Sequence, residues 1–311
     1  FTVEFDGKIY RPKTNRFRLR PENPKVWTPE DPHLYTVVVR NCADSVETYA
    51  ALRTIGVKKV GKYPRLLLNG KPYFFHGLLD QGYWPESLLT PPAPESYVDD
   101  ILAMKKLGFN MLRKHIKIEP LRWYYHCDRL GMIVWQDMVC GGKYFVPMTQ
   151  QYLPFIGIHL RDDRHYSWMG RGDAAGRLQF ESDMDETVQL LYNCVSLGLW
   201  VPFNEGWGQF DSLRITERLR SLDDTRPIDH ASGWHDQGVG KTEMRSLHTY
   251  YTPLTVPKDP RPVVLSEFGG YAFMPEGHAF HPGKEYGYRH YKTREEFALD
   301  VQALYRNEII P

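Results

Sequence analysis

Two segments of the chain end in a glutamate where a buried strand is expected to stop. Val201–Trp207 and Val263–Gly269 each begin with apolar, strand-forming residues, and a polar residue, a glutamate and a nearby glycine follow. A strand that delivers a carboxylate at its carboxyl end, twice in one chain, predicts two acids in one cleft. Hydrolysis of a glycosidic bond uses such a pair, because one carboxyl group protonates the leaving oxygen while the other meets the developing oxocarbenium ion. Glu205 and Glu267 are therefore the predicted catalytic pair of a sugar hydrolase.

The elements that must position this pair are predicted as strands alternating with helices from about residue 58. Expected strands are residues 73–76, 109–113, 132–137, 199–203, 228–231, 246–249 and 263–265. Expected helices run from about Glu95 to Gly108, over 120–130, from a cap at Ser182, around Ile215–Leu222 and around Phe297–Leu304. This alternation predicts a parallel sheet, and about seven units favour a TIM (β/α)8 barrel whose eighth strand lies beyond the end of the chain. A doubly wound open sheet is the alternative, but no GxGxxG follows the first strand.

The first part of the chain has the alternating pattern of β structure. Strands are expected at residues 1–5, 17–19, 34–39 and 46–52. About four strands are too few for a complete sandwich of roughly seven. We therefore expect residues 1–57 to be the C-terminal part of a β-sandwich and residues 58–311 to be the barrel domain.

Polar side chains recur where the predicted barrel strands end. The carboxyl ends of the strands surround the active site of such a barrel, so these side chains are candidates for substrate binding. An ion-pair role for the arginine, structural roles for the histidines and packing for the tryptophan are the alternatives. The candidates are Asp80, Arg113, His115, Asp137, Asn204, Trp207, His248 and Tyr250, with Tyr251 as an alternative to Tyr250. Residues 138–180 form a long irregular segment that is expected to shape the site.

The two glutamate motifs resemble those of glycoside hydrolase family 2, which contains β-galactosidases, β-glucuronidases and β-mannosidases. Asn204-Glu205 resembles the family's acid/base motif, and Ser266-Glu267-Phe268-Gly269 resembles its nucleophile motif. Val26–Tyr35 is similar to the end of the family's immunoglobulin-like domain, and Leu68–Pro72, leading into His76-Gly77, is similar to its barrel entrance.

The resemblance implies a retaining mechanism. Glu205 would be the general acid/base, Glu267 the nucleophile, and Asn204 a partner of the sugar 2-hydroxyl. Arg113, from a neighbouring strand end, would hold down the pKa of Glu267, so that this carboxylate stays ionised. The negative charge of Glu267 would in turn favour a protonated Glu205 at the start of the reaction.

The chain also departs from the family pattern. His115 stands one place early after Arg113, and Asp80 stands where many members carry histidine. The sugar is therefore open. We expect an exo-acting enzyme of the β-galactosidase type, with β-glucuronidase, β-mannosidase or a non-catalytic carbohydrate-binding protein as alternatives.

Composition excludes other classes of function. The 39 basic and 38 acidic residues give a net charge of +1. Such a balance does not indicate binding to nucleic acid or to an anionic membrane. The four cysteines lack metal-binding spacing, which favours reduced thiols and a cytoplasmic protein. No phosphate loop or metal-ligand cluster is visible, so no cofactor is expected, although the resemblance leaves Mg²⁺ or Na⁺ open. The expected partner is a carbohydrate, and family members often form homo-oligomers.

Overall fold

The computed structural model describes residues 1–251 and 253–310. The first part of the chain forms an antiparallel sheet with the strand order β2-β1-β3-β4. Its strands are β1 (Thr2–Phe5), β2 (Lys8–Tyr10), β3 (Tyr35–Arg40) and β4 (Ser45–Ala50). The predicted strand at residues 17–19 is wrong, because this stretch is irregular. It lies between Pro12 and Pro21, which lack the N–H that a ladder needs.

A second antiparallel sheet joins this part to the rest of the molecule. It consists of β5 (Ile55–Val60), β6 (Tyr63–Leu68) and β7 (Lys71–Pro72), none of which the sequence analysis expected. Ile55 and Leu68 are buried together with Met111, Ile133 and Leu199 from the parallel strands. The sheet therefore packs against the apolar interior on the side away from the strand ends that carry polar residues.

Four parallel strands with the order β11-β10-β9-β8 form the largest sheet of this second part. They are β8 (Gly77–Asp80), β9 (Met111–Lys114), β10 (Ile133–Asp137) and β11 (Leu197–Val201). The last three lie close to the predicted strands, but the prediction of a first strand at residues 73–76 is wrong. The side chain of Asn110 accepts from the backbone of His76 at 2.9 Å and donates to the carbonyl of Phe74 at 3.0 Å. The Asn110 side chain thus occupies backbone groups of Phe74 and His76 that a neighbouring strand would otherwise bond, and strand pairing begins at Gly77.

The remaining predicted strands follow in order. Residues 228–231 form no full strand, but single parallel bridges join Trp200 to Ile228 and Asn204 to Ser232. Next, β12 (Arg245–Thr249) pairs in parallel with β13 (Val263–Phe268). Over residues 1–251 and 253–310, the parallel backbone pairing is thus divided among the four-stranded sheet, the β12-β13 pair and a short pair of β14 (Tyr271–Ala272) with β15 (Arg289–His290), and it does not close a ring.

Helices alternate with these strands as predicted, and α3 is an additional short helix within the segment 138–180 that was expected to be irregular. They are α1 (Ser96–Lys106), α2 (Leu121–Leu130), α3 (Leu153–Phe155), α4 (Ala174–Leu191), α5 (Ser212–Leu222) and α6 (Arg294–Leu304). The predicted start of a helix at Ser182 is wrong. Helix α4 begins earlier because Asp173 caps it by accepting from the backbone of Gly176 at 2.8 Å. No helix of the described chain is both long and apolar enough to cross a bilayer.

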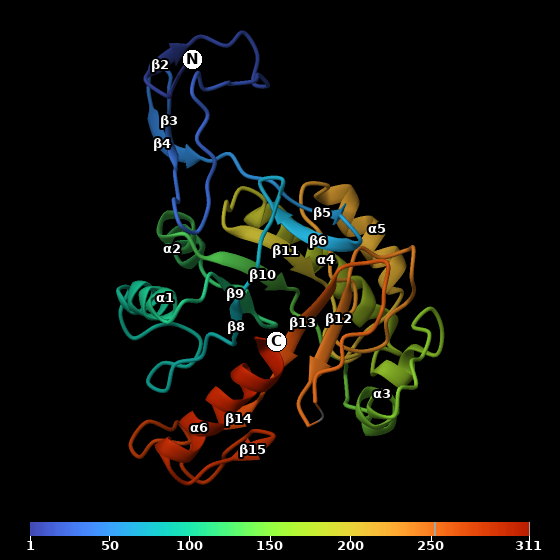
Figure 1. The fold of residues 1–311 in the computed structure, drawn as a ribbon. Helices are drawn as coiled ribbons and strands as arrows, with labels where there is room; N and C mark the ends of the chain where they lie inside the picture. The colour runs from blue at the N-terminus through green and yellow to red at the C-terminus, as the bar shows by residue number, and fades with distance from the viewer. Residues whose placement is uncertain (252, 311) are drawn as a thin grey trace.

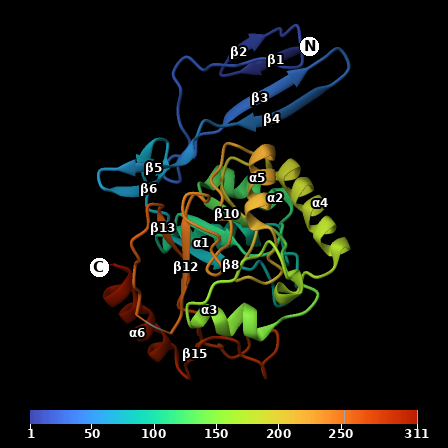
Figure 2. The ribbon, with the colours of Figure 1, turned by 90° about the vertical axis from the view of Figure 1, so that its right-hand side faces the viewer.

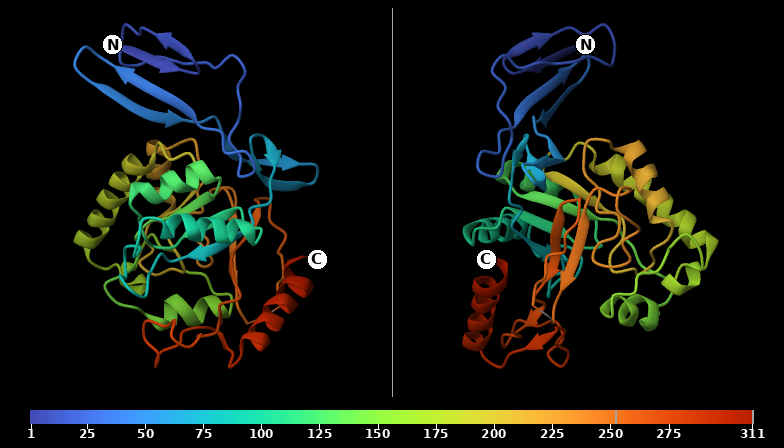
Figure 3. Two further views of the ribbon diagram at one scale, coloured as in Figure 1. Left: turned by 90° about the vertical axis from the view of Figure 1, so that its left-hand side faces the viewer. Right: turned by 45° about the vertical axis from the view of Figure 1, so that its right-hand side comes forward.

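One end of the molecule collects the loops that follow the strands. In Figure 1, β12 and β13 point toward the end where α3, β14 (Tyr271–Ala272) and β15 (Arg289–His290) lie. Figures 2 and 3 show the sheet of β1 to β4 at the opposite end. Side chains at the carboxyl ends of β12 and β13 are therefore on the side of α3 and β15.

Candidate active site

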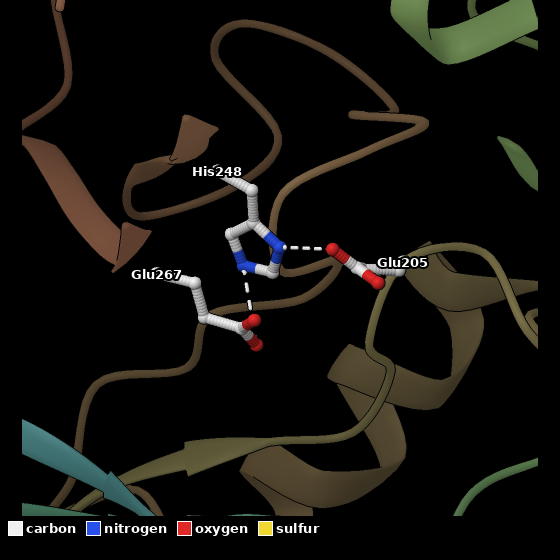
Figure 4. Close-up of side chains that lie close together, drawn as sticks. All are labelled: Glu205, His248 and Glu267. Carbon is white, nitrogen blue, oxygen red and sulfur yellow. Dashed lines mark hydrogen bonds and ion pairs between the residues drawn. The ribbon is translucent and has the colours of Figure 1, made fainter. Parts of the chain in front are cut away.

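Glu205 and Glu267 lie in the same site. One oxygen of each carboxylate and one ring nitrogen of His248 all lie within 4.8 Å of one another. The imidazole of His248 lies between the carboxylates (Figure 4), with Nδ1 2.8 Å from Oε1 of Glu205 and Nε2 3.7 Å from Oε1 of Glu267. Two segments distant in sequence thus deliver facing acids, as the sequence analysis expected.

The backbone around Glu205 is held in an unusual conformation. Glu205 has φ of 51°, a left-handed value that is uncommon for a residue with a side chain. Its N–H donates to the carbonyl of Ser232 at 3.0 Å, and a Cβ at the following Gly206 would lie 2.5 Å from His235. The tight turn aims the carboxylate into the site, and strain of this kind is concentrated at functional sites.

Arg113 of β9 joins the ends of the neighbouring strands. Its Nη1 donates to Oε1 of Glu267 at 3.0 Å, and Nε and Nη2 donate to the two oxygens of Asp137 at 2.9 and 3.1 Å. Nη2 also donates to Oδ1 of Asn204 at 2.8 Å. Since the guanidinium is buried, these charge-assisted bonds fix the relative positions of the three side chains.

The charges around Glu267 keep it ionised. Burial raises the pKa of its carboxyl group, but His248, Arg113, His115 and a hydrogen bond from Tyr250 together lower the pKa to about 2. Burial lowers the pKa of Arg113, but the charges of Asp137 and Glu267 outweigh this effect and raise its pKa above the ordinary value. Glu267 is thus a carboxylate throughout the pH range in which proteins work.

Tyr250 contacts both glutamates. Its hydroxyl donates to Oε2 of Glu267 and lies 3.1 Å from Oε1 of Glu205. Burial and the two glutamate charges raise its pKa well above the usual value, so the hydroxyl stays neutral and can donate. Its ring stacks on Tyr288, with 4.1 Å between the ring centroids.

The two predicted histidines occupy different positions. Nδ1 of His115 lies 2.9 Å from Oδ2 of Asp137 and 4.0 Å from Oε1 of Glu267, at the edge of the cluster. The side chain of His248 has no exposed surface, and its Nε2 lies 3.1 Å from the hydroxyl of Ser232.

The hydrogen bonds of Asp80 and the ring contact of Trp207, in the described part of the chain, do not involve the glutamate pair. Oδ2 of Asp80 accepts from Nζ of Lys114 at 2.8 Å, and Lys114 donates to the buried Glu119 at 3.0 Å. The ring of Trp207 meets that of Phe145 edge to face, with a centroid distance of 6.4 Å. Sugar contact by either residue stays a prediction.

Sequence reasoning missed a set of buried hydroxyls beneath the site. The Oγ atoms of Ser232 and Ser246 lie 3.1 Å apart, that of Ser266 is 3.2 Å from Ser232, and Ser246 and Ser266 are also hydrogen-bonded. Asp229 is buried close by, which raises the pKa of its carboxyl group. The sequence did contain a signal for this cluster, because Ser246 and Ser266 lie on predicted strands close to His248 and Glu267. A single serine on a strand, however, does not by itself predict a buried hydroxyl cluster.

The site also contains donors that a metal ion could use. Glu205, His248 and Glu267 place one ligand atom each within 4.8 Å of the others. Arg113, however, donates to Oε1 of Glu267 at 3.0 Å, so a bound cation would meet a guanidinium charge at one of its own ligands. The donor set fits a hydrogen-bonded carboxylate pair better than it fits a resident metal.

Comparison with known proteins gives the family and the fold of the chain. Residues 59–273 match the family described as "Glycosyl hydrolases family 2, TIM barrel domain", and residues 3–56 match "Glycosyl hydrolases family 2". The fold is similar to a β-galacturonidase from Eisenbergiella tayi bound to galacturonate, at 19% identity over 91% of this chain and 52% of that one, with a TM-score of 0.64.

Two β-glucuronidase structures are similar as well. That from Dictyoglomus thermophilum has a TM-score of 0.62 and 21% identity, covering 81% of this chain and 46% of that one. That from Parabacteroides merdae has a TM-score of 0.56 and 18% identity, covering 80% and 31%. The chain thus spans about a third to a half of the length of these proteins. Because the family match extends over most of its residues, the chain belongs to family 2 of the glycosyl hydrolases.

Proposed function

We propose that this chain forms the catalytic part of a retaining exo-β-glycosidase, with residues 1–57 as an immunoglobulin-like portion and residues 58–311 as the catalytic barrel. The observation that carries the proposal is the approach of the Glu205 and Glu267 carboxylates, which have oxygens within 4.8 Å of each other. Retaining enzymes hold their two carboxyl groups about 5 Å apart, whereas inverting enzymes leave roughly 6.5–9.5 Å for a water molecule. The observed separation supports direct attack by one of the carboxylates.

Glu267 is the proposed nucleophile and Glu205 the proposed acid/base. In the first step a Glu267 oxygen bonds to the anomeric carbon, the glycosidic C–O bond breaks, and Glu205 gives its proton to the leaving oxygen. In the second step Glu205 takes a proton from water, the water oxygen bonds to the anomeric carbon, and Glu267 leaves. The ionised state of Glu267 and its bond from Arg113 support this division of roles.

His248 supports the protonated state of Glu205. Its Nε2 lies near the Glu267 carboxylate and the Ser232 hydroxyl, so a proton on Nε2 is favoured over a lone pair there. In the state that reacts, the ring presents the Nδ1 lone pair to Glu205 at 2.8 Å, where a carboxylic O–H is the matching donor.

The polar strand ends form the proposed sugar side of the site. Asn204 gives its amide oxygen to Arg113, so its NH₂ group is the proposed donor to the sugar 2-hydroxyl. Asp137 and His115 lie beside Glu267 and are proposed to bind further hydroxyl groups. Contacts to the 2-hydroxyl that strengthen in the transition state add several kcal/mol to catalysis by such enzymes.

The identity of the sugar has two candidates. A terminal β-galactoside is the first, from the resemblance of the glutamate motifs. A terminal β-uronide is the second, because the similar solved structures described above are β-glucuronidases and a β-galacturonidase. A β-mannoside is a further alternative from the same resemblance. Carbohydrate binding without hydrolysis is less favoured because both glutamates are in place.

A substrate panel tests the proposal. The full-length protein is incubated with nitrophenyl β-galactoside, β-glucuronide, β-galacturonide and β-mannoside, and the first-formed sugar anomer is followed by ¹H NMR. The expected result is hydrolysis of one of them with a β-configured first product. An α-configured first product would contradict the retaining mechanism, and no hydrolysis together with sugar binding would favour the non-catalytic alternative.

A further inference from the structure

Three serine side chains beneath the site form a hydrogen-bonded group that ends at His248. We call it the serine cluster: Ser232, which follows residues 228–231, Ser246 of β12 and Ser266 of β13. Each Oγ atom is within hydrogen-bonding distance of the other two, and the Oγ of Ser232 also lies 3.1 Å from Nε2 of His248. The cluster therefore contacts the ring nitrogen that does not face Glu205.

An irregularity in the strand pairing turns Ser266 toward this cluster. Along β12 and β13, Leu247 pairs with Leu265 and His248 pairs with Glu267, so the pairing skips Ser266. An extra residue of this kind bends a strand and re-aims its side chains. Consecutive residues of a regular strand point to opposite faces, but here both Ser266 and Glu267 reach the region around His248.

The backbone of Ser232 holds the turn that carries Glu205. The N–H of Glu205 donates to the carbonyl of Ser232 at 3.0 Å, and the N–H of Ser232 donates to the carbonyl of Phe203 at 2.9 Å. The ring of His248 lies directly against the next residue, Gly233, where a Cβ would collide with the ring. The Ser232 hydroxyl and the ring are therefore fixed relative to Glu205, and what varies is which atoms carry the protons.

The protons of the cluster can be counted. Three hydroxyls supply one proton each, and they share five contacts: three with one another, one from Ser266 to the carbonyl of Leu247 and one from Ser232 to His248. The geometry directs the proton of Ser266 to Leu247, at 3.3 Å, and the proton of Ser232 to Ser266, at 3.2 Å. Ser232 then has only lone pairs left for Nε2 of His248, so Nε2 must carry a proton.

The opposite arrangement leaves more contacts without a proton. If Ser232 donated to His248, the three contacts within the cluster would share only the proton of Ser246, since that of Ser266 goes to Leu247. Two of these contacts would then place lone pairs against each other, whereas one does so when Ser232 accepts from Nε2. Because Ser232 and Ser246 are buried, the arrangement with fewer unsatisfied contacts is favoured.

The ionisable groups around the ring favour the same proton. Oε1 of Glu267 lies 3.7 Å from Nε2, and its negative charge attracts an N–H there. The hydroxyl of Tyr250 donates to Glu267 and gives no proton to Nε2. Asp229, buried next to Ser246, adds at most one proton together with one contact, so the shortage of protons in the cluster is unchanged.

We propose that the serine cluster is a positioning device for the acid/base. It holds a proton on Nε2 of His248 and thereby leaves Nδ1, 2.8 Å from Oε1 of Glu205, to accept the proton that Glu205 later gives to the leaving oxygen (Figure 4). The proposal rests on the proposed function, in which Glu205 is the acid. Without the cluster, the ring can keep its proton on Nδ1 and donate it to a Glu205 carboxylate, which has no proton for the first step.

The test compares two leaving groups on the preferred sugar, in the full-length protein. Ser266→Ala removes the acceptor of the Ser232 proton and frees that proton to point at His248. A methyl β-glycoside needs the proton of Glu205, whereas a dinitrophenyl β-glycoside has a leaving group that departs as an anion. The variant should lower kcat/KM about 3- to 10-fold for the methyl glycoside and less than about twofold for the dinitrophenyl glycoside.

A double substitution tests whether the serines act as one chain. Ser232→Ala should cause the same loss, dependent on the leaving group, and adding Ser266→Ala to it should cause no further loss, because Ser266 acts through Ser232. Thr216→Val is the control. It removes a buried hydroxyl on α5 that donates to the carbonyl of Ser212 in the same helix, and it should leave both rates unchanged.

Nuclear magnetic resonance of the wild type tests the proton directly. In protein labelled with ¹⁵N at histidine, the signals that disappear in His248→Ala should show a protonated Nε2. An unprotonated Nε2 would overturn the proposal without any serine variant.

The kinetic outcomes separate this proposal from the proposed function. Equal losses on the two glycosides, no loss on either, or losses that add in the double variant would overturn the role of the serine cluster and leave the proposed function intact. A wild-type protein that cleaves no glycoside would overturn the proposed function.

Discussion

Nδ1 of His248 lies 2.8 Å from Oε1 of Glu205, and the ring that makes this contact is completely buried. Its other nitrogen is held between the Ser232 hydroxyl and the Glu267 carboxylate. The imidazole therefore links the protonation states of the two glutamates: an ionised Glu267 favours a proton on Nε2, which leaves Nδ1 as an acceptor for the proton of Glu205. This link gives a specific prediction for substitution of the histidine.

His248→Ala should lower kcat/KM about 10- to 100-fold, the range expected for loss of a hydrogen bond to a reacting group. The alkaline limb of the pH profile should move to lower pH, because the acceptor that holds the proton of Glu205 is gone. His248→Asn is the matched variant, since its amide oxygen can replace Nδ1. Asn should restore part of the activity and of the alkaline limb. Identical profiles for the two variants would show that the ring serves only packing.

The low pKa of Glu267 makes stability depend on pH. Its folded pKa of about 2 lies below the ordinary value of 4.5, so its contribution to the free energy of unfolding is fully present above pH 4.5 and is lost as the pH falls from 4.5 to 2. The expected loss is about 3 kcal/mol. Denaturant unfolding at successive pH values measures it.

Glu267→Gln supplies the reference for this measurement, since glutamine cannot titrate. As the pH falls through this window, the free energy of unfolding of the wild type should fall by more than that of the variant. A difference that stays constant from pH 5 to pH 2 would mean that Arg113 and His248 do not hold the carboxylate in the ionised form.

Asp80 should matter more for stability than for catalysis. It accepts from the buried Lys114, so Asp80→Asn leaves that ammonium with fewer charged partners and should lower the free energy of unfolding by about 1–3 kcal/mol. Because its side-chain hydrogen bonds go to Lys114 and the Gly82 backbone and not to the glutamate pair, kcat/KM should change less than about threefold. Asp163→Asn, in an exposed ion pair, should cost less than about 1 kcal/mol. A large fall in kcat/KM for Asp80→Asn at normal stability would instead indicate sugar contact.

Catalysis should not require a metal ion. Arg113 supplies the positive charge next to Glu267, so dialysis against EDTA should change kcat by less than about twofold. Added Zn²⁺ should inhibit, because Glu205, His248 and Glu267 can act together as ligands. The His248→Ala variant should be inhibited more weakly. Loss of activity in EDTA that Mg²⁺ restores would contradict this expectation.

Much of the candidate site was predictable because parallel strands bring their carboxyl ends together. An apolar run followed by a polar residue was sufficient to place Glu205, Glu267, Arg113 and Asp137 at one end of the fold. The same reasoning gave the order of strands and helices, since the apolar pattern reports which segments are buried.

Errors arose where a side chain outside the expected segment decides the local structure. Asn110 replaces the backbone partners of residues 74–76, so the first parallel strand begins later than its apolar pattern indicates. Asp173 starts α4 ahead of Ser182, which has the same capping chemistry but lies within the helix.

The most direct test of the central claim is to trap the covalent intermediate. The full-length protein is treated with a 2-deoxy-2-fluoro β-glycoside of the preferred sugar that carries an activated leaving group, digested, and examined by mass spectrometry. The account predicts one fluoroglycosyl group per protein, attached to Glu267, and no label in Glu267→Gln. A label on Glu205, or full inactivation without a label on Glu267, would contradict it.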